Sequence, residues 1–220
     1  MRPADRYGLA VADWQTISAL ATAGGTLVLA VATFSAVRSS NRSARIAQDA
    51  LLAGMRPLLV PSLSDDPIHK VLWGDQHAVR LSGGRAVAEA HGGVIYLALA
   101  VRNVGAGIAL LHGGVPTPDR AFANDPHADA DGFRRLTVDL YVPAGGAGYW
   151  EGAIRDPDDP LRPGFLNALT ERRPFTIDLL YGDQQGGQRT ISRFVVLPAS
   201  DDGWYCQAVR HWNLDRPDPR

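Results

Sequence analysis

The chain has 220 residues, with 22 Lys and Arg against 23 Asp and Glu, and one cysteine. This charge balance disfavours a basic nucleic-acid-binding module, and one cysteine excludes both a disulfide framework and a zinc site built from several thiolates. The 23 glycines and 15 prolines favour many turns and short strands.

An uncharged stretch follows a short N-terminal segment, residues 1–13. No charged residue occurs from Trp14 to Val37, and a helix of this length spans the hydrocarbon core of a bilayer, which is about 30 Å thick. Trp14 stands at the edge of the stretch, where aromatic residues of membrane helices are enriched. The sequence therefore predicts one transmembrane helix over residues 14–37.

Two other interpretations of this stretch stay open. It could be a helix buried in a soluble domain, although such helices normally carry charges on one face. It could also be a cleaved signal peptide, because Ala30-Val31-Ala32 has the small residues of a cleavage site. Against this, Asp5 and Asp13 cancel the positive charge that a signal peptide carries before its apolar region.

The flanking charges predict an orientation. Two arginines precede the uncharged stretch, whereas four follow it within twenty residues: Arg38, Arg42, Arg45 and Arg56. The positive-inside rule places the more basic side in the cytoplasm, and a lone cysteine fits a reducing compartment. We therefore expect a single-pass protein of the cell membrane with a cytoplasmic C-terminal domain.

A basic linker covers residues 38–56. At about 100° per residue, its arginines fall on one stripe of a helix, and its Ala, Ile, Leu and Met residues fall largely opposite. This pattern predicts a short amphipathic helix that ends before Pro57. Its expected contacts with anionic lipid headgroups are Arg38, Arg42 and Arg45.

Small residues also recur along one face of the apolar stretch, at Ser18, Ala21, Thr22 and Gly25. Such faces allow helices to pack closely, although small residues can also simply make an anchor less apolar. The expected partners are accordingly the lipid bilayer and either another protein or a second copy of the chain, with no nucleic acid.

Beyond Pro57 the pattern changes to the alternation typical of strands, most clearly over Val94–Arg102, where Ile95, Leu97, Leu99 and Val101 face one way. Turns are expected at Gly-Gly pairs (83–84, 92–93, 113–114, 145–146 and 186–187) and at proline-rich breaks (116–118 and 156–163). The expected strands are 58–60, 77–81, 94–102, 108–111, 136–142, 149–154, 175–181, 190–197 and 204–212, with a helical turn at 164–172. The sequence thus predicts a mainly β fold, an immunoglobulin-like β-sandwich over residues 57–212, followed by a flexible tail, residues 213–220.

Two short motifs extend this prediction. Arg56-Pro57 follows the basic linker, and a strand ends in Asn103-Val104-Gly105-Ala106-Gly107-Ile108-Ala109; farther on come Tyr181, Asp183, Gly187, Thr190 and Phe194. This arrangement resembles uncharacterised bacterial single-pass membrane-anchored proteins with a C-terminal immunoglobulin-like β-sandwich domain. In that family a strand ends in Asn-x-Gly-x-Gly/Pro-x-Ala, and a later one reads Tyr-x-Asp-x-x-Gly. The resemblance implies a fold and a topology and carries no activity.

The same residues have a structural interpretation of their own. Gly105 and Gly107 permit a positive φ where the strand ends, and Asn103 can hydrogen-bond its own backbone there. Asp183 and Gly187 are typical of a hairpin turn. All five are predicted to shape turns.

One segment has the composition of a metal-binding loop. Asp125, Asp129 and Asp131 alternate with other residues, but the EF-hand pattern also needs an acidic first ligand and a glutamate at position twelve. Counted from His127, those positions hold His and Val138. A weak divalent-metal site at the three aspartates is one alternative, and a solvated acidic loop is the other.

Recognised catalytic motifs are missing from the sequence. The glycines after Asn103 imitate a dinucleotide-binding loop, but Leu110 replaces the third glycine and no helix is expected to follow. The six histidines show no metal-binding spacing, and Cys206 lies in a strand pattern, where a thiol usually packs as a small apolar group. No cofactor is therefore predicted.

Three functions follow from these observations. The first is a non-catalytic, membrane-tethered module for protein interaction or sensing. The second is a divalent-metal-dependent hydrolase that uses the acidic loop 125–131. The third is a periplasmic or cell-surface binding domain, which requires the opposite orientation or cleavage of the N-terminal segment.

Overall fold

The computed structural model describes residues 5–216 and, within them, the side chains of residues 14–136 and 140–216. The described chain divides after Leu51 into two compact units, a helical one and a β domain that begins at Leu52. Residues 1–4 of the predicted N-terminal segment and residues 217–220 of the predicted tail lie outside the described residues.

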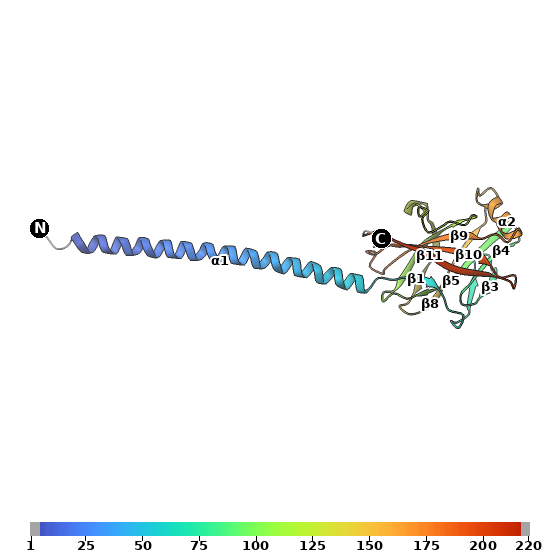
Figure 1. The fold of residues 1–220 in the computed structure, drawn as a ribbon, viewed down its shortest axis with the longest axis horizontal. Helices are drawn as coiled ribbons and strands as arrows, with labels where there is room; N and C mark the ends of the chain where they lie inside the picture. The colour runs from blue at the N-terminus through green and yellow to red at the C-terminus, as the bar shows by residue number, and fades with distance from the viewer. Residues whose placement is uncertain (1–4, 217–220) are drawn as a thin grey trace. The chain divides into compact units, whose positions relative to one another are not determined.

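The N-terminal element is one uninterrupted helix, α1 (Asp5–Gly54), 50 residues long. It covers both the apolar stretch and the basic linker, so the predicted amphipathic helix is the continuation of the apolar one. The helix ends at Gly54, and Pro57 cannot donate a backbone hydrogen bond to prolong it. Figure 1 shows α1 and the strands of the β domain.

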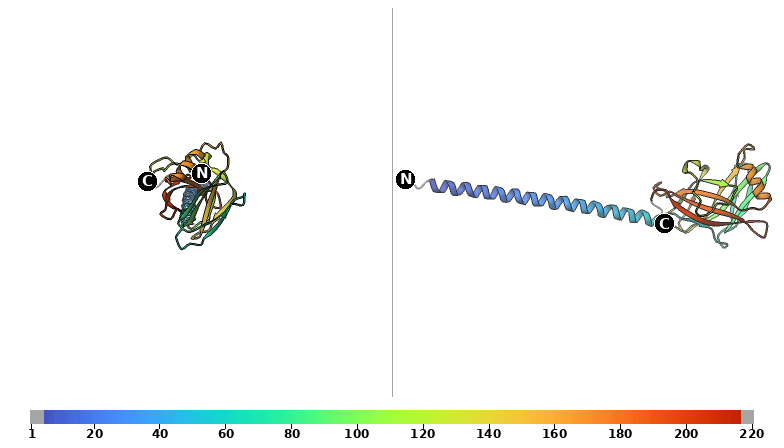
Figure 2. Two further views of the ribbon diagram at one scale, coloured as in Figure 1. Left: turned by 90° about the vertical axis from the view of Figure 1, so that its right-hand side faces the viewer. Right: turned by 45° about the horizontal axis from the view of Figure 1, so that its top comes forward.

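Nine antiparallel strands form one curled sheet, in the order β1-β5-β4-β11-β10-β9-β6-β7 with β8 also paired to β5. The views of Figure 2 show how these strands wrap around a common interior. Two further strands form a separate hairpin, β2 (His69–Leu72) and β3 (Ala78–Leu81). The sheet strands are β1 (Leu59–Pro61), β4 (Arg85–His91), β5 (Val94–Asn103), β6 (Ala109–Thr117), β7 (Arg134–Val142), β8 (Ala147–Ile154), β9 (Phe175–Gly182), β10 (Thr190–Pro198) and β11 (Trp204–Asn213).

Most of the predicted strands are confirmed, and the exceptions have physical causes. β4 was not predicted because its inward residues, Ala86 and Ala88, are small and give a weak alternating signal. The prediction of a turn at Gly113-Gly114 is wrong, because β6 continues through these two residues and through Pro116. A Cβ on Gly114 would lie only 2.6 Å from the indole ring of Trp150, so this glycine makes room for a ring instead of turning the chain.

Two helical elements complete the β domain: α2 (Arg162–Thr170), close to the predicted helical turn, and a 3-10 turn, η1 (Ala130–Gly132). Phe165 of α2 is fully buried in the main core. The helix therefore contributes an aromatic side chain to the core, where the Phe165 ring packs edge-on against that of Phe175.

β5 explains the most apolar run of the sequence. Its predicted inward set, Ile95, Leu97, Leu99 and Val101, lies in the main core with residues of β9, β10 and β11, as expected. The alternate residues of the strand lie in a second cluster with Trp73, beneath the β2–β3 hairpin. A strand that is buried on both faces carries apolar residues at nearly every position.

Candidate functional site

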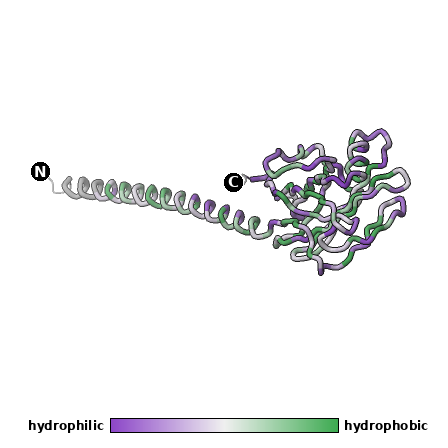
Figure 3. The backbone as a smooth tube through the Cα atoms, turned by 45° about the vertical axis from the view of Figure 1, so that its right-hand side comes forward, coloured by the Kyte–Doolittle hydropathy of each residue, from purple (hydrophilic) through white to green (hydrophobic). Residues whose placement is uncertain are grey.

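The first candidate is the apolar part of α1. All described side chains of residues 14–50 are exposed, and the large apolar ones are more than half exposed, for example Leu27 (67%) and Phe34 (69%). Burying one such side chain would be favourable by about 1.5–3 kcal/mol relative to leaving it in water. Among the described residues this one helix is long and apolar enough to span a membrane. Figure 3 shows the apolar colours along it, with polar colours nearer its C-terminal end.

The exposure also bears on the alternative interpretations of the stretch. A helix in the core of a soluble domain would be mostly buried, whereas none of this segment is. A signal peptide would pass the same test of length and composition, so that alternative stays open.

Hydroxyl groups within the stretch are satisfied by the helix itself. Thr22 Oγ1 donates to the Ser18 carbonyl oxygen at 2.8 Å, and Thr33 Oγ1 donates to the Leu29 carbonyl oxygen at 2.7 Å. Further bonds of this kind are made by Ser18, Thr26 and Ser35. Since an unpaired polar group costs several kcal/mol in hydrocarbon, these internal bonds suit the helix to an apolar environment.

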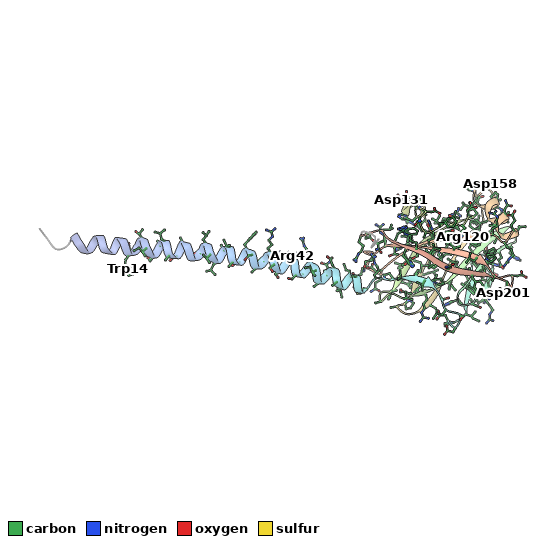
Figure 4. All side chains as sticks on the ribbon, in the orientation of Figure 1. Trp14, Arg42, Arg120, Asp131, Asp158 and Asp201 are labelled. Carbon is green, nitrogen blue, oxygen red and sulfur yellow. The ribbon has the colours of Figure 1, made fainter. Side chains whose placement is uncertain are left out.

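The basic stripe, Arg38, Arg42 and Arg45, follows the apolar stretch directly. All three side chains are exposed on α1, and Figure 4 shows Arg42 projecting from the helix. The spacing keeps them on adjoining turns of one face. Contact of this stripe with lipid headgroups stays a prediction.

The glycines predicted to adopt positive φ after β5 act differently. Neither Gly105 nor Gly107 has a positive φ. A Cβ on Gly105 would instead overlap the carbonyl oxygen of Arg56, and one on Gly107 would overlap that of Met55. Both glycines are therefore required because the chain segment before β1 passes directly over this turn.

Asn103 ties the same turn together. Its Oδ1 accepts hydrogen bonds from the backbone N–H groups of Leu58 (3.1 Å) and Gly105 (3.0 Å), and its Nδ2 donates to the Val142 carbonyl oxygen at 3.1 Å. The side chain is fully buried. The predicted bond to its own turn is confirmed, and the bonds to β7 and to the segment before β1 are new.

Arg56 lies beside this turn and is held by polar side chains. Its Nε donates to Gln188 Oε1 at 3.3 Å, and its Nη1 donates to Asn213 Oδ1. Burial, more than neighbouring charges, lowers the pKa of Arg56. Nearby, burial raises the pKa of Tyr181 to about 12, so that this hydroxyl stays neutral and accepts a bond from the backbone N–H of Leu59.

The second predicted turn is built around Asp183. Its Oδ1 accepts from the backbone N–H groups of Gln185 at 3.1 Å and Gly187 at 2.9 Å. The positive φ of this turn, 75°, belongs to Gly186, whereas Gly187 serves through its N–H group. Asp183 and Gly187 thus shape the β9–β10 connection, as expected.

The acidic loop does not gather its carboxylates. Asp125 Oδ2 accepts from the backbone N–H of Phe122 at 2.7 Å, and Asp129 Oδ1 accepts from that of Asp131 at 3.3 Å. Among the side chains that the structure describes, those of residues 14–136 and 140–216, no three His, Cys, Asp or Glu groups are close enough together to hold a metal ion. Figure 4 shows Asp131 at the periphery of the domain. Two of these carboxylates therefore serve the loop backbone.

A buried arginine holds this loop on the sheet. Arg193, which is 3% exposed, forms a bidentate pair with Asp178 at 2.8 Å for each bond. Its remaining N–H groups donate to carbonyl oxygens of the loop, those of Phe122, Asp125 and Pro126. All of these partners stabilise a loop conformation, and sequence reasoning had no signal that would single out this arginine.

One nucleophile-like pair was also not predicted. Ser192 Oγ lies 2.6 Å from His211 Nδ1 and 2.7 Å from the Tyr181 hydroxyl. Ser192 is fully buried. Its two contacts link β9, β10 and β11 through their side chains.

A cavity of about 460 Å³ lies between β7 and β8. These strands are joined by a short turn, yet each is paired on its other side only, β7 with β6 and β8 with β5. We call the gap between their facing edges the seam. Its walls include Leu136 of β7, and Trp150, Glu151 and Gly152 of β8.

Comparisons with protein-family models, with curated proteins and with solved structures gave no match to this chain.

Proposed function

We propose that this protein is a non-catalytic, single-pass membrane protein whose β domain interacts with another protein. The observation that carries the proposal is the exposed, uncharged stretch of α1, residues 14–37, in a chain whose β domain packs as a separate unit. A bilayer removes the cost of exposing that stretch to water. The intrahelical bonds of its hydroxyl groups support the same conclusion.

The proposal includes an orientation, with the β domain in the cytoplasm. Its support is the excess of arginine on the C-terminal side of the stretch, where Arg38, Arg42 and Arg45 lie exposed. At about 1 kcal/mol for each basic residue near an anionic surface, the stripe adds to anchoring at the cytoplasmic leaflet.

We also propose that the β domain is related to the immunoglobulin-like sandwiches. The support is a core in which residues of β5 and β8 pack with residues of β9, β10 and β11, all of them antiparallel strands. Division of the strands into two separate sheets in a crystal structure would support this relation, and closure into a barrel would contradict it.

Labelling with a membrane-impermeant thiol reagent in intact cells tests the orientation. Burial raises the pKa of the Cys206 thiol, and its side chain lies in the core. We therefore expect the natural cysteine not to react with the reagent. Asp158→Cys places a thiol at an exposed position of the β domain. We expect labelling only after lysis, and labelling in intact cells would contradict a cytoplasmic domain.

The partner interaction has two testable routes. Self-association through the small-residue face is expected to weaken in Gly25→Leu, which meets no neighbouring atom within 4 Å in the described chain. A bacterial two-hybrid assay in the membrane measures it, with Val28→Leu as the control. Unchanged association in Gly25→Leu would leave the β domain as the interacting part, and the seam is the place to test it.

A further inference from the structure

The seam presents two strand edges that lack partners. Among the described strands, β7 pairs only with β6 and β8 only with β5, so the edges that face each other have no ladder of backbone hydrogen bonds. An unpaired edge carries a row of N–H donors and C=O acceptors that can pair with another extended chain. Natural proteins usually cover or charge such edges.

Trp150 forms an apolar wall of the cavity at the seam. A Cβ on Gly114 or on Gly152 would lie 2.6–2.7 Å from the nearest atom of its ring, so the indole lies directly against two backbones. The side chain is 2% exposed, and its Nε1–H has no acceptor within the described residues. The wall thus combines a large apolar surface with an unused donor.

Two of the three arginines at the cavity are already paired. Arg134 pairs with Asp159 at 2.7 Å, and Arg155 pairs with Asp75 at 3.2 Å. Arg135, which is exposed, makes no ion pair and no hydrogen bond from its side chain to the part of the chain that the structure describes. Its guanidinium group is therefore available to an anion.

Glu151 adds an unused acceptor on the same strand as Trp150. Its Oε2 is buried and has no donor among the described residues, and burial raises the pKa of this carboxyl group although Arg155 opposes the shift. The groups left without partners at the seam are thus of both kinds, donors at Arg135 and Trp150 and an acceptor at Glu151.

We propose that the seam binds an extended peptide segment of a partner protein, with apolar side chains that enter the cavity and an acidic side chain that pairs with Arg135. This rests on the proposed interaction function and names its partner chemistry. A peptide backbone offers both donors and acceptors, as two unpaired strand edges require. The cavity of about 460 Å³ has room for apolar side chains and is far larger than one ion needs.

Panning of a random peptide library tests the proposal. The full chain in nanodiscs is exposed to displayed peptides of about nine residues, a length that covers one strand, and empty nanodiscs remove lipid binders. Enriched peptides are then titrated against the wild type, Arg135→Glu and the matched control Arg80→Glu, which changes an exposed arginine on β3. Circular dichroism confirms that all three chains are folded.

We expect the enriched peptides to carry an acidic residue and to lose about tenfold or more in affinity for Arg135→Glu, because like charges then face each other, with little change for Arg80→Glu. Methylation of alternate peptide N–H groups should also abolish binding, since strand pairing uses those groups. The proposal is overturned if no peptide is enriched, if both charge variants bind equally well, or if methylated peptides bind as before. Membrane retention is measured in a separate experiment, so none of these three results bears on the proposal that the uncharged stretch anchors the protein.

Discussion

The central prediction concerns one leucine in the uncharged stretch. Leu27 lies near its middle and is 67% exposed, with its side chain free of the β domain core. Substitution by arginine therefore changes the transfer of the helix into lipid without changing the packing of the β domain. Any loss of membrane association in Leu27→Arg then reports on insertion alone.

The magnitude follows from the composition of the stretch. Eight large apolar residues lie between Ile17 and Val37, and at about 0.3–0.6 kcal/mol each they favour insertion by about 2–5 kcal/mol. An arginine at the centre of a helix costs about 2.5–3.5 kcal/mol, and the leucine contribution is lost as well. The substitution thus removes about 3–4 kcal/mol, which is most of the favourable free energy.

Alkaline carbonate extraction of membranes measures the effect. We expect the wild type to stay with the pellet and Leu27→Arg to move largely to the supernatant. The matched control is Leu51→Arg, an exposed leucine of the same helix that lies outside the uncharged stretch, and it should stay with the pellet. If Leu27→Arg is retained as firmly as the control, the stretch is not what anchors the protein, and the reasoning fails.

Three further predictions concern the stability of the β domain, measured by chemical denaturation of the full chain in detergent. Gly107→Ala should destabilise it by roughly 1–3 kcal/mol through overlap with a backbone carbonyl, whereas Gly187→Ala, with open space around its Cβ, should not; equal effects would contradict the steric argument. Arg193→Met should cost about 3–5 kcal/mol because it leaves a buried carboxylate unpaired, and the exposed Arg80→Met should cost almost nothing; a stable Arg193→Met would refute the role of this pair. Burial raises the pKa of Asp159, but a backbone N–H bond and the Arg134 ion pair outweigh it and lower the pKa overall. The ionised carboxylate therefore stabilises the fold above the unfolded pKa, about 3.9, and this stabilisation is lost as the pH falls through the folded pKa. The difference in unfolding free energy between wild type and Asp159→Asn should accordingly shrink in acid. A difference that stays constant with pH would contradict this role of Asp159.

Much of the architecture could be predicted from local patterns. The uncharged stretch, the helical linker and strands such as β5 and β9 have strong apolar periodicity, so their positions follow from the sequence. β4 was not predicted because alanine fills its inward positions, and only the first part of β6 was predicted because glycine and proline interrupt the pattern of the rest. In both cases side chains of other strands fill the space that the small residues of the strand leave.

The candidate sites likewise include features that could be predicted from local sequence and features that could not. The turns at Asn103 and Asp183 were predictable because their side chains bond to backbone groups a few residues away. The constraint on Gly107 could not be predicted, because the atom that a Cβ would overlap is the carbonyl oxygen of Met55, which is distant in the sequence. Sequence spacing left a weak metal site and a solvated acidic loop as alternatives at residues 125–131, and in the structure Asp125 and Asp129 accept hydrogen bonds from nearby backbone N–H groups.

The sequence by itself determined the segregation of the chain into an apolar helix, a basic stripe and a turn-rich β domain, because each depends on residues that are neighbours along the chain. Only the tertiary structure decided which strands pair and where a strand edge is left open. The seam between β7 and β8, with Arg135 and Trp150 at its walls, exists because a curled sheet brings strands together without closing them. No periodicity encodes a missing hydrogen-bond partner, since its absence depends on where every other strand lies.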